Sequence, residues 1–78
     1  MESASEPVLL KRFGKRVAEL RKEKEMTQQQ LAEKVNMSVV TIAYIETGQR
    51  WVKLRTLDKL AIALDVDISE LLKLKFSL

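Results

Sequence analysis

The chain has 78 residues, 46% of them hydrophobic, with two glycines, one proline, no cysteine and a formal net charge of +3. That size and composition predict one small, mostly helical domain, and they exclude a second domain, disulfides and thiolate metal sites. No apolar run is long enough to cross a membrane or to mark a signal peptide, so we expect a cytoplasmic protein without a membrane partner.

A first helix is predicted after a short polar tail. Residues 1–7 are expected to form a flexible N-terminal tail, and residues 8–78 the folded domain. From residue 8 to about residue 25, Phe13, Val17 and Leu20 recur at the i, i+4, i+7 spacing of a helix with one buried face.

The next predicted helix is short and carries both a start and a stop signal. Thr27 is a favoured N-cap, and Gln30 three residues later can complete a capping box, so this helix should span about residues 28–35. Asn36 follows, and asparagine tolerates the left-handed backbone conformation that ends helices.

A second short helix follows after a tight turn and presents an uncharged surface. Ser38 offers its N-cap and Gly48 its stop, which places the helix at about residues 39–47. Ile42 and Ile45 form its inward pair. The outward residues are Val39, Val40, Thr41, Ala43 and Tyr44.

Two more helices complete an all-α fold of five helices. Apolar residues at helical spacing predict a helix over about residues 54–65, although no residue there is a clear N-cap. Asp67 with Glu70 three residues later resembles a capping box and predicts the start of a fifth helix. No alternating strand pattern competes with this assignment.

Basic residues are concentrated around the pair of short helices. Residues 8–64 contain twelve Lys or Arg and six Asp or Glu, whereas the segments on either side are net acidic. A moderately basic surface suits a polyanion, and ordinary solvated surface charge is the alternative interpretation.

The combined pattern resembles the phage repressor and Cro type of helix-turn-helix domain, also called the XRE-like family, over residues 13–72. The motifs that carry the resemblance are Thr27-Gln28, Leu31-Ala32, Ile45-Glu46 with Gly48, and Leu60-Ala61 with Leu64. The resemblance implies a repressor-like domain that binds double-stranded DNA sequence-specifically and regulates transcription. The chain departs from the family pattern where Asn36 replaces a common glycine and Val52 a common proline.

The resemblance also implies which residues meet DNA. The N-terminal part of the second short helix should read bases in the major groove, through Ser38, Val39, Val40, Thr41 and Tyr44. Phosphates should be bound by Gln28, Arg50, Lys53 and Arg55. Arg21 and Glu46 are expected to form a structural pair that ties the first helix to the reading helix. Gln28 as a merely solvated residue is the alternative for that position.

The two valines predict a chemical preference. Valine cannot make the bidentate hydrogen bonds by which arginine reads guanine, but it can pack against the 5-methyl group of thymine. A half-site with thymine at one or two positions is therefore expected. The alternative for one of the valines is a partly buried position in the core. Val39 is the better candidate for that role, because it lies three residues before the inward-facing Ile42.

A homodimer is expected, because a single motif of this size grips too little DNA for tight selective binding. Leu72, Leu74, Phe76 and Leu78 make the chain end unusually apolar and are the candidates for the dimer seam. Their alternative role is to close the core of the monomer. Trp51 is expected either to pack over the adjacent loop or to contact a second copy or a DNA sugar.

The residue content also bears on other classes of function. The chain has no histidine, no cysteine and no glycine-rich phosphate loop, so we expect neither an enzyme nor a cofactor. The alternative function is a protein-interaction module on the same fold, such as an antitoxin with a toxin partner or a bridging factor.

Overall fold

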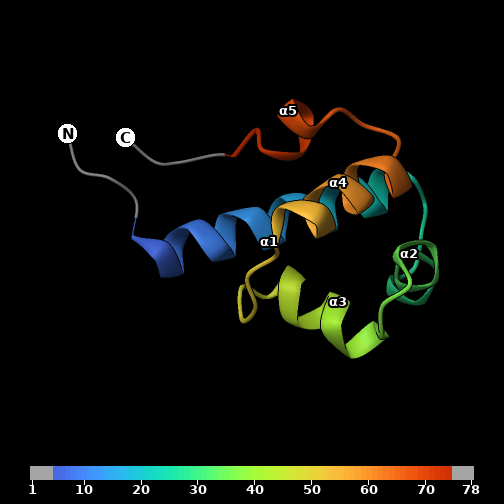
Figure 1. Cartoon of the computed structure of the whole chain (residues 1–78), viewed down its shortest axis with the longest axis horizontal. Helices are drawn as coiled ribbons and strands as arrows, with labels where there is room; N and C mark the ends of the chain where they lie inside the picture. Colours follow the sequence, from blue (N-terminus) through green and yellow to red (C-terminus); the bar gives the residue numbers. More distant parts are fainter. Residues whose placement is uncertain (1–4, 75–78) are drawn as a thin grey trace.

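The computed structural model describes residues 5–74, a range that contains five α-helices and no strand (Figure 1), in agreement with the predicted fold class. The helices are α1 (Glu6–Glu23), α2 (Gln28–Val35), α3 (Val39–Glu46), α4 (Leu54–Ala63) and α5 (Ile68–Leu71).

Three helices begin at a side chain that caps them. The Ser5 hydroxyl accepts the backbone N–H of Val8 at the start of α1, so residues 5–7, which the sequence had placed in the tail, belong to this helix and its cap. The predicted capping box of α2 is confirmed: the Thr27 hydroxyl accepts the Gln30 N–H at 3.0 Å, and the Thr27 N–H donates to the Gln30 side chain at 2.8 Å.

The expected capping box of α5 is wrong. Asp67 occupies the N-cap position of this helix but makes no side-chain cap hydrogen bond. The Glu70 carboxylate instead accepts a hydrogen bond from Nη2 of Arg16 at 2.7 Å. A charge-assisted bond to a guanidinium is roughly twice as strong as a neutral one, so Glu70 is held against α1 rather than against its own helix start.

Four helices end in the same backbone conformation. A residue with positive φ follows each of them: Glu25 (55°), Asn36 (57°), Gly48 (75°) and Asp65 (55°). The next residue in each case donates its backbone N–H to the carbonyl five residues earlier, at 2.8 to 3.1 Å, which is the Schellman pattern. Three of these next residues, Met26, Met37 and Val66, then pack against the core.

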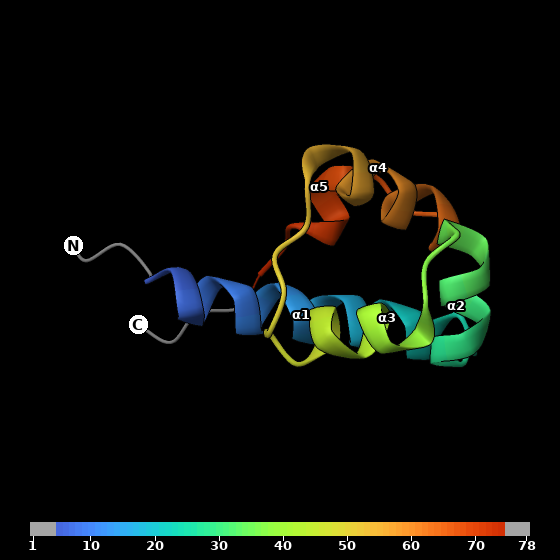
Figure 2. The ribbon, with the colours of Figure 1, turned by 60° about the horizontal axis from the view of Figure 1, so that its bottom comes forward.

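The core lies between the five helices. Its fully buried side chains come from every helix: Phe13, Val17, Leu31, Ile42, Ile45, Leu60, Leu64 and Leu71. α1 contacts both α3 and α5, while α2 contacts α3 and α4. In Figures 1 and 2, α3 and α5 lie on different sides of α1. No helix within residues 5–74 is long and apolar enough to cross a membrane.

Glycine at the two acidic left-handed positions should stabilise the fold. An L-residue in this conformation costs roughly 1–2 kcal/mol, a cost that glycine avoids. We expect Glu25→Gly and Asp65→Gly each to raise the free energy of unfolding by about 1 kcal/mol, measured by urea denaturation followed by circular dichroism. Lys22→Gly, in the last turn of α1, is the control and should lose up to about 1 kcal/mol; stabilisation by that variant too would contradict the explanation.

Candidate nucleic-acid interface

The outward face of α3 is exposed and uncharged. Val40 is 55% exposed, Tyr44 46% and Val39 37%, whereas Ile42 and Ile45 on the other face are fully buried. Val39 is the less exposed of the two valines, and both remain accessible to a ligand. A helix with this surface can enter a groove without having to desolvate charge.

Two hydroxyls at the start of α3 are engaged with each other. Ser38 Oγ accepts the backbone N–H of Thr41 at 3.1 Å, which caps the helix, and it lies 2.9 Å from Thr41 Oγ1. One hydrogen serves that shared bond, so the pair retains a single O–H that can donate to a ligand. Ser38 and Thr41 therefore offer one hydrogen-bond donor together.

The backbone of α1 touches the C-terminal end of α3 directly. A Cβ atom on Gly14 would lie 2.1 Å from the carbonyl oxygen of Ile45 and 2.7 Å from that of Glu46. Just after α3, a Cβ on Gly48 would lie 2.8 Å from Cα of Lys11. Both glycines of the chain thus lie at one junction, where only hydrogen fits between the two segments.

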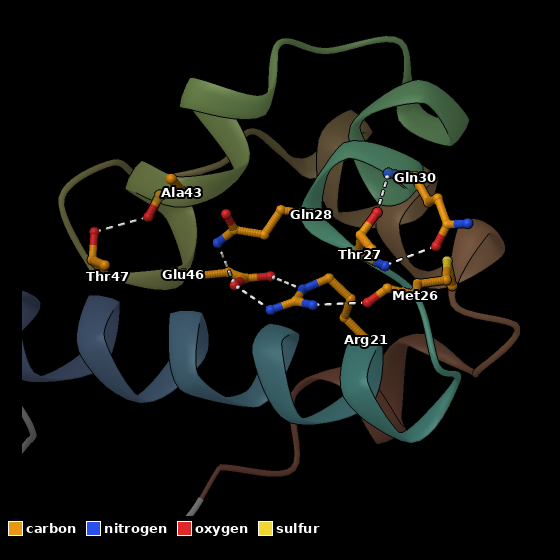
Figure 3. Close-up of polar contacts among 8 residues, drawn as sticks. All are labelled: Arg21, Met26, Thr27, Gln28, Gln30, Ala43, Glu46 and Thr47. Carbon is orange, nitrogen blue, oxygen red and sulfur yellow. Dashed lines mark hydrogen bonds and ion pairs between the residues drawn. The ribbon is translucent and has the colours of Figure 1, made fainter.

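A buried polar cluster fixes the same junction (Figure 3). The Arg21 guanidinium donates from Nε to Oε2 of Glu46 at 2.7 Å and from Nη2 to Oε1 at 3.1 Å. Its Nη1 donates to the Met26 carbonyl at 2.8 Å. The two side chains are only 11% and 6% exposed. The pair thus links α1, the turn before α2, and the end of α3.

Gln28 belongs to this cluster rather than to open solvent. Its side-chain Nε2 donates to Oε1 of Glu46 at 2.9 Å, from the first residue of α2 (Figure 3). An amide nitrogen carries two N–H groups, so one remains after this bond. The first backbone N–H groups of α2 also have no carbonyl acceptor within the helix. One of them, the Gln30 N–H, donates to the Thr27 hydroxyl. The amide and the helix start together form a set of donors beside α3.

The basic candidates lie in and after the segment that follows α3. Arg50, Lys53 and Arg55 are all exposed. Lys11 lies against Gly48 and was not singled out by the sequence, since it is one of six basic residues on α1. Only the close approach of α1 to residue 48 distinguishes it from the others. Among residues 5–74, no group of acidic or histidine residues could hold a metal ion.

Trp51 covers one edge of the core while remaining half exposed. Its ring centroid lies 6.1 Å from that of Phe13, with the planes tilted by 56°. The indole is 54% exposed, whereas Phe13 is 2% exposed. Trp51 thus contacts Phe13 of α1 and leaves an aromatic face accessible.

The dimer candidates separate in the structure. Leu72 is 44% exposed, whereas Leu74 is partly buried against the core of its own monomer; Phe76 and Leu78 lie outside the described residues. Sequence reasoning missed Leu54 and Ile62, which are 79% and 71% exposed on α4. Their eight-residue separation, two helical turns plus about 80°, could have suggested one broad outward face, but that helix was interpreted only for its core residues.

Comparisons with known proteins agree with this geometry. Residues 17–71 match the family model described as Helix-turn-helix. The immunity repressor protein of Bacillus phage phi105 is 43% identical over 56 residues, which are 72% of this chain and 39% of the repressor. The chain therefore spans about two fifths of that relative's length.

Two control proteins match over most of their length. Control protein C.MunI of a Mycoplasma species is 36% identical over 61 residues, which are 77% of this chain and 82% of that protein. The restriction-modification controller protein C.AhdI from Aeromonas hydrophila is 41% identical in sequence, and its crystal structure matches this one with a TM-score of 0.75. The match covers 81% of this chain and 94% of the controller protein.

The buried pair should matter far more for stability than a similar pair at the surface. Glu46→Ala leaves the Arg21 charge buried without its carboxylate, which costs about 3–5 kcal/mol. Glu70→Ala removes an equally short pair with Arg16, whose side chain is 13% exposed. Glu70 itself is 47% exposed, and Arg16 keeps the backbone carbonyl of residue 70 and Glu19 as partners, so we expect a smaller loss of about 1 kcal/mol. Urea denaturation measures both, and equal losses would contradict the role given to burial.

Gly14→Ala separates two opposing effects. Helix propensity alone predicts that alanine stabilises α1 by about 1 kcal/mol. The contact with the α3 carbonyls predicts a loss of about 1–3 kcal/mol from overpacking. We expect the loss, measured as the shift of the thermal unfolding midpoint. Lys22→Ala, exposed on the same helix, is the control and should change stability by less than about 0.5 kcal/mol. Stabilisation by Gly14→Ala would show that the two helices separate freely.

Proposed function

Since the chain belongs to the helix-turn-helix family, and is a DNA-binding transcriptional regulator, we propose that it reads an inverted-repeat operator as a homodimer with α3 in the major groove. The observation that carries the proposal is the exposed, uncharged face of α3, held from behind by the buried cluster of Arg21, Glu46 and Gln28. Such a regulator acts in the cytoplasm of a bacterium, where its DNA is. The control proteins and the phage repressor among its relatives favour this function over the antitoxin or bridging alternative.

Base reading is assigned to the N-terminal half of α3. Val39 and Val40 are the exposed residues of its first turn, and their methyl groups suit the 5-methyl of thymine. The Ser38 and Thr41 hydroxyls supply the one remaining donor, and Tyr44 lies one turn farther along the same face. The half-site should therefore contain thymine opposite the valines.

Phosphate binding is assigned to the start of α2 and to the basic residues beside α3. The free N–H of the Gln28 amide and the backbone N–H groups of the first turn suit one phosphate oxygen. Because Glu46 holds that amide, Gln28 meets the phosphate with a side chain already oriented. Arg50, Lys53 and Arg55 add cations on the loop and the start of α4. Lys11 joins them through its position against Gly48.

Dimerisation is assigned to the apolar surface of α4 and the end of α5. Leu54, Ile62 and Leu72 are large apolar side chains left exposed in the monomer. A two-fold axis across α4 would set Leu54 against Ile62 of the partner subunit, so that one surface serves both copies. Two recognition helices about 34 Å apart would then fit successive major grooves.

Selection of bound duplexes from a random pool tests dimerisation and base reading together. We expect an inverted repeat with half-sites about 10 base pairs apart, each containing thymine. Replacing that thymine by uracil removes one methyl group and should weaken binding roughly fourfold, the value of about 0.8 kcal/mol per buried carbon. For Val40→Ala the same replacement should have little effect, whereas Ile62→Ala should bind a single half-site with unchanged thymine preference.

Three results would contradict this assignment. An unrepeated site would exclude the dimer on DNA. Equal uracil sensitivity in the wild type and in Val40→Ala would show that this valine does not touch the methyl group. Loss of folding by Val40→Ala, seen by circular dichroism, would make the residue part of the core.

The salt dependence of binding tests the phosphate contacts one at a time. Each phosphate contact contributes about −0.9 to the slope of log K against log salt. A residue that makes this contact in both subunits of a dimer therefore contributes twice that value. Arg50→Gln, Lys53→Gln and Arg55→Gln should each reduce the slope by about 1.8 per dimer, measured by fluorescence anisotropy of a labelled duplex. Lys34→Gln, exposed on the far end of α2, is matched in charge and should leave the slope unchanged. Equal changes in all four variants would indicate general electrostatic attraction instead of defined contacts.

A further inference from the structure

The reading face of α3 carries methyl groups and hydroxyls, but none of the side chains that select one base by a bidentate bond. Residues 38–44 contain no Arg, Lys, Asn, Gln, Asp or Glu. Those are the side chains that bind guanine or adenine through two hydrogen bonds, or accept from the amino group of cytosine. Apolar contact through the exposed Val39 and Val40 is therefore the selective element of this face.

The hydroxyl pair at the same helix start suits either kind of polar base edge. Ser38 Oγ and Thr41 Oγ1 lie 2.9 Å apart, and either hydroxyl can donate the hydrogen of that bond. Whichever of them donates, one O–H stays free and at least one lone pair remains on Thr41 Oγ1. The pair can therefore donate to O4 of thymine or accept from the N4 amino group of cytosine. These hydroxyls do not reject a cytosine that replaces a thymine.

A methyl group in the major groove is not unique to thymine. 5-Methylcytosine carries its methyl group at the same ring position, and in both bases the group projects into the major groove. The two pyrimidines differ in the polar group on the adjacent ring carbon. A valine side chain neither donates nor accepts a hydrogen bond, so its contact depends on the methyl group alone. Unmodified cytosine lacks that group and leaves the valines without their contact.

We propose that α3 binds 5-methylcytosine at the position of the thymine, so that methylation of a cytosine there strengthens binding. The inference rests on the proposed function, because it uses the contact of the valines with a 5-methyl group. The ligand is duplex DNA modified at carbon 5 of cytosine. The regulator then responds to the modification state of its operator without a small-molecule effector.

The size of the effect follows from the burial of one methyl group. One buried carbon changes affinity about fourfold, which is the same factor as for thymine over uracil. A homodimer contacts two half-sites, so methylation of both should strengthen binding about fifteenfold. This gain is small for one half-site and easily measured for two.

Four duplexes test the proposal at one base pair of the selected operator. They carry thymine, uracil, cytosine or 5-methylcytosine opposite the valines, first in one half-site and then in both. Their Kd values are measured by fluorescence anisotropy at one salt concentration. We expect 5-methylcytosine to bind about fourfold more tightly than cytosine in one half-site and about fifteenfold in both. Cytosine and its methylated form present the same hydrogen-bonding groups, so the ratio isolates the methyl group.

Two variants and one further duplex serve as controls. Val39→Ala/Val40→Ala removes two exposed side chains, so it should fold like the wild type by circular dichroism and bind cytosine and 5-methylcytosine equally. Tyr44→Phe removes only a hydroxyl from the same face and should keep the fourfold ratio, of about the wild-type size, whatever its overall affinity. In the further duplex, 5-methylcytosine outside both half-sites should leave the affinity of the wild type unchanged.

The outcomes separate a failure of this inference from a failure of the proposed function. A preference for thymine over uracil without any gain from 5-methylcytosine would overturn the inference and leave the valine contact standing. Absence of both preferences would contradict the base reading assigned to the valines and the inference with it. A gain from 5-methylcytosine that persists in the double valine variant would also overturn the inference, since another group would then contact the methyl.

Discussion

The contact between α1 and the end of α3 is the constraint on which the rest of the molecule depends. At Gly14 no side chain separates the two helices, and the last carbonyls of α3 rest on the α1 backbone. Arg21 and Glu46 hold the same helices together a few residues away through two hydrogen bonds. The steric contact limits how closely α3 can approach α1, and the ion pair limits how far α3 can move away from it. The outward face of α3 is consequently presented at a defined height above the core.

The shared conformation of the helix ends fixes the turns between the helices. In α1, α2 and α4 a left-handed residue reverses the chain, and the following Met26, Met37 or Val66 packs against the core. Each turn is therefore fastened by a backbone hydrogen bond and by an apolar side chain at once. This construction lets helices as short as α2 and α3 persist, because short helices depend on tertiary packing more than on propensity.

Local signals in the sequence predicted the five helices and the boundaries of α2 within the described range, because capping and stop residues act over only a few positions. The same reasoning failed at Asp67 and Glu70, where a long-range bond to Arg16 outcompeted a local cap. It could not anticipate the bond from Gln28 to Glu46 or the position of Lys11, since both arise from the approach of α1 and α2 to α3. Leu54 and Ile62 were missed for a different reason, because the apolar spacing of α4 was interpreted only for its core residues.

The two faces of α3 are chemically independent. Ile42, Ile45 and Glu46 carry its attachment to the domain, whereas Val39, Val40 and Tyr44 make no hydrogen bond through their side chains to the rest of residues 5–74. Substitutions on the outer face can therefore accumulate at little cost in folding free energy, while those on the inner face cannot. A lineage of such proteins can diversify its DNA targets by exchanging a handful of surface residues on one unchanged scaffold.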